Sequence, residues 1–212
     1  PQISEKQLRE YYFPAFEMCV KKGKAASIMT AYIALNDVPC TLNAWLLQKV
    51  LRQDWGFRGY VVSDCGGPSL LVNAHKYVKT KETAATLSIK AGLDLECGDD
   101  VYDEYLLNAY KQYMVSDADI DSAACHVLAA RMKLGMFDSK ERNPYARISP
   151  SVIGSKDHQQ VALDAARECI VLLKNQKNML PLNVDKLKSI AVVGINAGTC
   201  EFRDYSGAPV IE

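Results

Sequence analysis

Apolar residues recur at three- to four-residue spacing along much of the chain, which is the pattern of amphipathic helices. This spacing predicts a helix over residues 3–22, and Pro14 predicts a kink or break within it. A second helix is predicted over residues 43–55, with Asn43 as its candidate N-cap. Further helices are predicted over residues 69–77, 81–90, 102–114, 120–134 and 156–169.

Polar residues stand where two of these helices should begin. Thr80 precedes the helix predicted over residues 81–90. Ser116 is followed three residues later by Asp119, which is the pattern of a capping box. Gly135 marks the end of the helix that this box should open.

Short apolar runs between the helices predict buried strands over residues 26–32, 60–63 and 93–96. Helices and strands alternate in this part of the chain, which favours parallel strands joined by right-handed crossovers. Two more strands are predicted later in the chain, over residues 170–174 and 188–193.

A polar stretch divides these elements into two groups. Residues 138–150 contain Pro144 and Pro150 and show no hydrophobic period, so we interpret them as a linker. Only three strands of the barrel type come before it, whereas a (β/α)8 barrel needs eight strands in about 250 residues. These three strands cannot close on themselves, and an open parallel edge would be exposed.

Composition narrows the classes of function. The chain has 25 Lys and Arg against 25 Asp and Glu, so its balanced charge gives no reason to expect binding to nucleic acid or to an anionic membrane. No apolar run approaches the roughly 20 residues of a membrane-spanning helix. None of the 7 cysteines forms a C-x-x-C pair. Cys65 and Cys97 each follow a predicted strand end, so their thiols could lie close enough for a disulfide, with unbonded buried thiols as the alternative.

The segment with the clearest chemistry is Gly-Phe-Arg-Gly-Tyr-Val-Val-Ser-Asp-Cys, residues 56–65. A strand there ends in Asp64, and the chain then turns through residues 66–68, Gly-Gly-Pro. Enzymes with α/β barrels carry reactive groups at such C-terminal strand ends. The alternative is that Asp64 only caps the next helix.

Four other segments occur with it in a fixed order. They are Ser-Ile-Met-Thr-Ala-Tyr at 27–32, Ala-Gly-Leu-Asp-Leu-Glu-Cys-Gly at 91–98, Ala-Arg-Glu-Cys-Ile-Val-Leu-Leu-Lys-Asn at 166–175 and Leu-Pro-Leu at 180–182. Together they resemble the family 3 glycoside hydrolases, the β-glucosidase and β-xylosidase group, from about residue 8 to residue 209. The resemblance implies an α/β fold: the C-terminal part of a (β/α)8 TIM-like barrel at 1–137, a linker at 138–150, and the beginning of an α/β sandwich domain at 151–212.

The resemblance also implies roles for individual residues. Asp64 matches the nucleophile of the family, and Tyr32 matches a tyrosine beside it that could bond Asp64 or face the sugar. Cys65 stands where many β-glucosidases carry tryptophan, and Ser-Asp-Cys looks more like the β-xylosidase branch. Glu96 could reach a sugar hydroxyl, with a structural salt bridge as the alternative. The chain departs from the family at Ile33, where asparagine is usual, and at Asp37, where a turn glycine is usual.

The second carboxyl group of a retaining mechanism has no clear candidate. Family members commonly supply this acid/base from the second domain, and Glu201 and Glu212 lie in no matching motif. We therefore expect the acid/base to lie outside this chain. Asp117, Asp119 and Asp121 resemble the first half of a calcium-binding loop, but Ser122 and Leu128 replace its required glycine and glutamate. The three histidines lack the spacing of a zinc site, so we expect no metal and no cofactor.

These features predict a retaining, exo-acting β-glycosidase that hydrolyses terminal β-linked glucose or xylose from an oligosaccharide or β-glycoside. We expect the rest of the same catalytic unit to be its partner, with no nucleic acid or membrane partner. A non-catalytic carbohydrate-binding or structural relative is the alternative, and a nucleotide binder built on the Gly194–Gly198 turn is a third hypothesis. The sequence leaves the sugar, the linkage and the oligomeric state open. Location is open too, with periplasmic or extracellular favoured by the resemblance.

Overall fold

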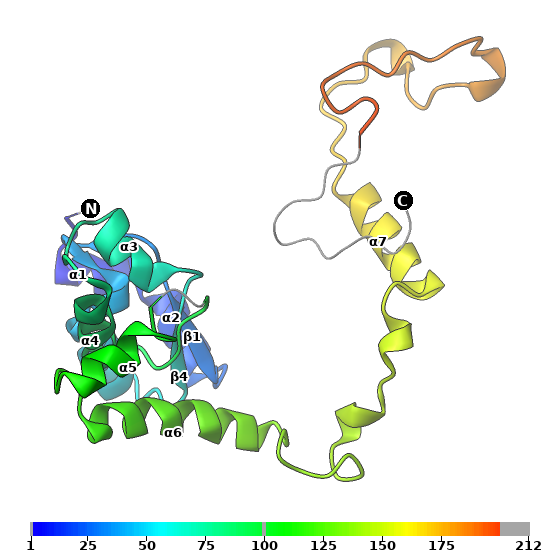
Figure 1. Ribbon diagram of the computed structural model, residues 1–212. Coiled ribbons are helices and arrows are strands. Elements are labelled where there is room, and N and C mark those ends of the chain that lie inside the picture. The colour runs from blue at the N-terminus through cyan, green and yellow to red at the C-terminus, as the bar shows by residue number, and fades with distance from the viewer. Residues whose placement is uncertain (1, 99–100, 200–212) are drawn as a thin grey trace. The chain divides into compact units, whose positions relative to one another are not determined.

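The computed structural model describes residues 2–98 and 101–199, which fall into two compact units (Figure 1). The first unit comprises residues 1–143 and the second comprises residues 144–212. The division between them falls inside the predicted linker, while the domain bounds themselves stay a prediction. No helix of the described residues is both long and apolar enough to cross a membrane.

The first unit opens with three short helical segments in place of one continuous helix. They are α1 (Glu5–Gln7), a π-helical turn η1 (Leu8–Tyr12) and α2 (Pro14–Lys21). The break predicted at Pro14 is confirmed, because α2 begins at this residue, where the missing N–H of proline costs nothing.

Two strands form the parallel core of the first unit. β1 (Ser27–Thr30) pairs in parallel with β4 (Tyr60–Ser63), with Ser27 opposite Tyr60 and Thr30 opposite Ser63 (Figure 1). The third predicted strand is shorter than expected, because Leu95 forms only an isolated parallel bridge with Val62. The parallel order of the three segments is nevertheless the predicted one.

A small hairpin separates β1 from the following helices. β2 (Ala34–Leu35) and β3 (Val38–Pro39) are antiparallel, and Asn36 and Asp37 between them have φ values of 49° and 65°. Both residue types tolerate this left-handed conformation, which explains how the turn forms without a glycine.

Helices surround the parallel strands. Asn43 accepts a hydrogen bond from the Leu46 amide at 3.0 Å, as expected for a cap, and Thr80 and Ser116 cap their helices as predicted. The elements are η2 (Cys40–Leu42), the π-helical η3 (Trp45–Asp54), α3 (Gly67–Asn73), α4 (Lys81–Ala91), α5 (Tyr105–Lys111) and α6 (Asp117–Lys133).

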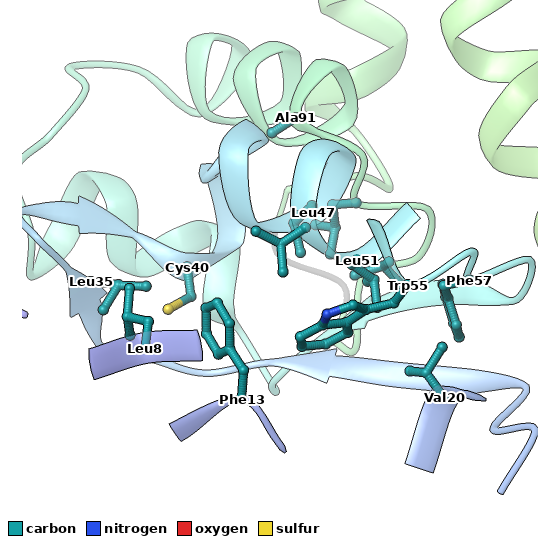
Figure 2. Packing of buried hydrophobic residues seen from close by; sticks show 13 residues of the cluster. Leu8, Phe13, Val20, Leu35, Cys40, Leu47, Leu51, Trp55, Phe57 and Ala91 are labelled. Atoms are coloured by element: carbon teal, nitrogen blue, oxygen red, sulfur yellow. The ribbon is translucent and has the colours of Figure 1, made fainter. Parts of the chain in front are cut away.

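The main hydrophobic cluster lies between the N-terminal helices, η3 and the two strands. Figure 2 shows side chains of this cluster, including Phe13 and Trp55. The Phe13 and Trp55 rings meet edge to face, with their centroids 5.4 Å apart. Val50, Val61 and Leu93 are fully buried in the same cluster. A second cluster joins α3 to α4. Packing on both flanks therefore fixes the position of β4 and of the residues that follow it.

The second unit contains helices but no strand among its described residues. Its elements are η4 (Pro144–Arg147), η5 (Pro150–Val152), α7 (Lys156–Glu168), η6 (Gln176–Asn178) and η7 (Val184–Lys186). The strands predicted over 170–174 and 188–193 are wrong for this chain, because both segments are irregular and exposed. A strand needs a neighbour for its N–H and C=O groups, and no described segment pairs with either one. The Gly194 turn consequently has no strand before it, as a dinucleotide site would require.

Candidate active site

The C-terminal ends of the three parallel segments meet at one edge of the first unit. The Asp64 amide donates to the Thr30 carbonyl at 3.2 Å, and the Gly66 amide donates to the Cys97 carbonyl at 2.8 Å. The residues that follow β4 are therefore held on both sides by the neighbouring segments. This arrangement is the one expected for the active-site edge of an α/β barrel.

Asp64 is half-buried at this edge, and its carboxylate is only partly engaged. Its Oδ1 atom accepts a hydrogen bond from the Cys65 amide at 2.8 Å. In the described part of the chain, Oδ2 accepts no hydrogen bond. The hydrogen bond from the Cys65 amide orients the carboxylate, and the second oxygen is left available to a reacting group.

The structure does not support helix capping as the role of Asp64. The residue at the cap position of α3 is Gly66, and no side chain caps that helix. Gly66 has a φ of 68°, in the left-handed region that favours glycine, so the sharp turn after Asp64 is built by the residues beyond it.

Tyr32 follows β1, and its side chain contacts the residue after Asp64. Its hydroxyl donates to the Cys65 carbonyl at 2.7 Å, and 41% of the residue is exposed. We expected this hydroxyl to bond Asp64 itself or to face the sugar. This hydrogen bond holds the peptide group between Cys65 and Gly66, and the role of Tyr32 toward Asp64 or the sugar stays a prediction.

The Cys65 and Cys97 thiols lie close together, as their strand-end positions predict. Their Sγ atoms are 2.8 Å apart, and both residues are free cysteines in the structure. The hydrogen bond from Cys65 raises the pKa of the Cys97 thiol, with burial and the nearby carboxylates adding to the effect. A raised pKa reduces the thiolate fraction of Cys97, which disfavours this thiol as a nucleophile.

Glu96 is almost completely buried, with 8% of its surface exposed. Its Oε2 atom accepts hydrogen bonds from the backbone amides of Val101 at 3.0 Å and of Tyr102. Burial, followed by the charges of Glu96 and Asp94, raises the pKa of Tyr102 well above its ordinary value. In these contacts Glu96 ties the end of the third segment to Val101 and Tyr102, and its reach to a sugar hydroxyl stays a prediction.

A buried ionic network that the sequence did not reveal lies at the opposite end of β4. Asp94, whose side chain is 4% exposed, accepts hydrogen bonds from Arg52 at 2.6 Å and from the Val61 amide at 2.7 Å. His126 Nδ1 lies 2.8 Å from its other oxygen. The network ties η3, β4, the third segment and α6 together. It holds the strand from which Asp64 emerges.

His75 is a second residue that sequence reasoning missed at the site. Its Nε2 atom donates to the Tyr32 carbonyl at 2.8 Å. No side-chain pattern could reveal this contact, because the acceptor is a main-chain group. Among the described residues, no group of three His, Cys, Asp or Glu side chains could hold a metal ion. Glu201 and Glu212 lie outside the described residues.

Comparison with known proteins agrees with this arrangement. Residues 1–130 match the sequence profile of the glycosyl hydrolase family 3 N-terminal domain. This chain belongs to glycoside hydrolase family 3. The N-terminal domain of the family is of the TIM-barrel type, and the first unit is a part of it.

Relatives in this family carry β-xylosidase names. The chain is 39% identical over 211 residues to probable β-D-xylosidase 7 of Arabidopsis thaliana, covering 98% of this chain and 27% of the relative. It is 38% identical over 224 residues to a β-xylosidase of Formosa agariphila, covering 98% of this chain and 30% of that protein. The chain thus spans between a quarter and a third of the length of these relatives.

Solved structures of the family share the fold. An exo-β-xylosidase in complex with a xylobiose aziridine activity-based probe matches with a TM-score of 0.74 and 36% identity, over 87% of this chain and 24% of that one. A β-glucosidase from Listeria innocua in complex with glucose matches with a TM-score of 0.69 and 29% identity, over 86% and 24%.

Proposed function

We propose that this chain is part of a retaining, exo-acting β-glycosidase in which Asp64 is the nucleophile. The observation that carries the proposal is the position of Asp64 at the C-terminal end of β4, with one oxygen bonded to the Cys65 amide. The names of the relatives, which are β-xylosidases and β-glucosidases, support the same class of reaction.

The reaction needs two carboxyl groups roughly 5–5.5 Å apart. Asp64 attacks the anomeric carbon while an acid donates a proton to the departing glycosidic oxygen, leaving a covalent glycosyl-enzyme. The same acid then acts as a base and removes a proton from the water that hydrolyses this intermediate. We propose that this acid/base belongs to a part of the enzyme outside the chain described here.

The substrate we propose is an oligosaccharide or β-glycoside with a terminal β-linked xylose or glucose. Cys65 favours xylose, because it replaces a tryptophan that would stack on the sugar in many β-glucosidases. Both relatives compared over nearly the whole chain carry β-xylosidase names. Tyr32, Cys65 and Glu96 would border the sugar. Residues 151–212 would begin the second, α/β sandwich domain, and the remainder of the catalytic unit would be the partner.

The decisive experiment labels the full-length enzyme with a 2-fluoro-glycoside, which traps the glycosyl-enzyme, and maps the label by mass spectrometry. We expect the label on Asp64. Asp64→Asn should lower kcat on the order of 10⁴-fold, as loss of a covalent nucleophile does. The matched control is Asp121→Asn on the exposed face of α6, which should leave kcat unchanged. A label on a different carboxylate would refute the assignment.

Two outcomes separate this proposal from its alternatives. A non-catalytic carbohydrate-binding relative would bind xylose or glucose but turn over no aryl β-glycoside at full length. The isolated 212-residue chain should itself show negligible turnover, and robust turnover would disprove the proposed position of the acid/base.

A further inference from the structure

We propose that His75 is a positioning residue that holds Tyr32, and through Tyr32 the carbonyl of Cys65, the residue after Asp64, in the geometry needed for nucleophilic attack. The inference rests on the proposed function, because it assigns His75 a role in the same reaction. His75 contacts the main chain of Tyr32 rather than Asp64.

The contacts form a closed loop that starts and ends at Cys65. From Cys65 the chain turns into α3, which ends at Asn73, and reaches His75 two residues later. His75 Nε2 lies 2.8 Å from the Tyr32 carbonyl, and the Tyr32 hydroxyl lies 2.7 Å from the Cys65 carbonyl.

The peptide groups on either side of Cys65 are therefore fixed by different partners. The Cys65 amide donates to Asp64 Oδ1, whereas the Cys65 carbonyl accepts from Tyr32. If Tyr32 moves, the Cys65 peptide gains freedom, and the carboxylate bonded to that residue follows it. A displacement of even about 1 Å at a reacting group lowers the rate substantially.

The anchor at the far end of this chain of contacts is rigid. Leu71 of α3 is fully buried against Ala84 and Ala85 of α4 and against Val101. The His75 amide donates to the Leu70 carbonyl at 2.8 Å, so the residue continues from the packed end of the helix. His75 thus links the packed helix α3 to the exposed segment that contains Tyr32.

The chemistry of the contact determines what His75 contributes. A backbone carbonyl can only accept a hydrogen bond, so Nε2 must carry a proton. Both the imidazolium and the neutral ring with its proton on Nε2 meet this requirement. His75 therefore acts as a donor and transfers no proton, and a glutamine side chain can supply an equivalent N–H group.

The test compares His75→Phe with His75→Gln in the full-length enzyme. His75→Phe keeps a ring but removes the donor, and we expect kcat to fall about tenfold, the scale of one lost hydrogen bond. KM should stay within about twofold, because no group that binds the ground-state sugar is removed. His75→Gln should restore most of the lost kcat and leave the pH profile unchanged. Equal losses in both variants, or a lost pH limb in His75→Gln, would overturn the proposal.

A double-mutant cycle tests whether His75 acts through Tyr32. In a Tyr32→Phe background, His75→Phe should lower kcat by no more than about twofold further, because the contact it supports is already gone. Tyr113→Phe is the matched control, since Tyr113 is 95% exposed and should respond to His75→Phe as the unmodified enzyme does. Fully multiplicative losses for His75 and Tyr32 would contradict the proposal.

A crystal structure of His75→Phe adds a readout that does not depend on turnover. The Tyr32 hydroxyl should be displaced from the Cys65 carbonyl, and an unchanged contact would count against the role of His75. Failure of the proposed function looks different, because the 2-fluoro-glycoside would then label a residue other than Asp64 or none at all.

Discussion

The two units of this chain contain similar helical signals but differ in burial. α6 in the first unit begins with a capping box at Ser116, and α7 in the second begins with Ser155 accepting from the His158 amide. The first unit, which contains α6, has three clusters of buried hydrophobic residues. No described residue of 144–199 is buried. Helix signals therefore act locally, whether or not a core forms beside them.

Strands behave differently from helices in this comparison. Residues 60–63 and 170–174 are both short apolar runs, yet Val61 is fully buried in β4 whereas Val171 is 72% exposed in an irregular segment. β4 has Ser27–Thr30 beside it, and 170–174 has no paired neighbour within the described residues. An apolar run becomes a strand only where another segment completes its hydrogen bonds.

The largest effect on stability should come from the buried ionic network of the first unit. Asp94→Ala leaves the Arg52 guanidinium and the Val61 amide without their acceptor in the interior. Breaking a buried pair in this way costs about 4 kcal/mol of unfolding free energy. Urea unfolding of the 212-residue chain, followed by tryptophan fluorescence from Trp45 and Trp55, measures the loss.

The control for this change is Asp164→Ala in the second unit. Asp164 pairs with Arg167 on α7 at 3.4 Å, with both side chains more than half exposed. Solvent screens such a pair, so the unfolding curve should not move. Similar curves for Asp94→Ala and Asp164→Ala would show that burial does not separate the two units as described.

Much of the first unit follows from local sequence signals. The bounds of Tyr60–Ser63, the break at Pro14 and the caps at Thr80 and Ser116 are all confirmed. Each depends on residues within a few positions of one another, so a single sequence contains the necessary information. The closeness of Cys65 and Cys97 also followed, because neighbouring parallel strands bring their ends together.

What could not be predicted depends on groups far apart in sequence or on the main chain. Arg52 and Asp94 are separated by 42 positions, and no local pattern marks them as partners. His75 binds a carbonyl, which every residue possesses, so the identity of Tyr32 gives no hint of the contact. The strand predicted over 170–174 failed for a related reason, since its pairing depends on a segment elsewhere.

A smaller but clear difference between the units should come from truncating leucine. Leu71 is fully buried against α4, whereas Leu173 in the second unit is 90% exposed. Leu71→Ala removes buried methyl groups and leaves a cavity, which costs about 3 kcal/mol. Leu173→Ala should leave thermal and urea unfolding unchanged. An equal loss from both would imply that residues 170–174 are packed in solution.

The smallest effect in this series should come from the helix caps. Ser116→Ala removes the acceptor for the Asp119 amide and the serine half of the capping box, costing about 1 kcal/mol. The amide and hydroxyl of Ser116 lower the pKa of Asp119 below its ordinary value of 3.8. A lowered folded-state pKa contributes stability above the ordinary pKa and loses it as the pH falls through the folded-state value. The difference between Ser116→Ala and the unmodified chain should therefore be largest at neutral pH and shrink in acid. Ser155→Ala removes the serine cap of α7 and should not change the unfolding of the first unit at any pH. Both helices begin with a serine cap, but only α6 contributes to a buried cluster.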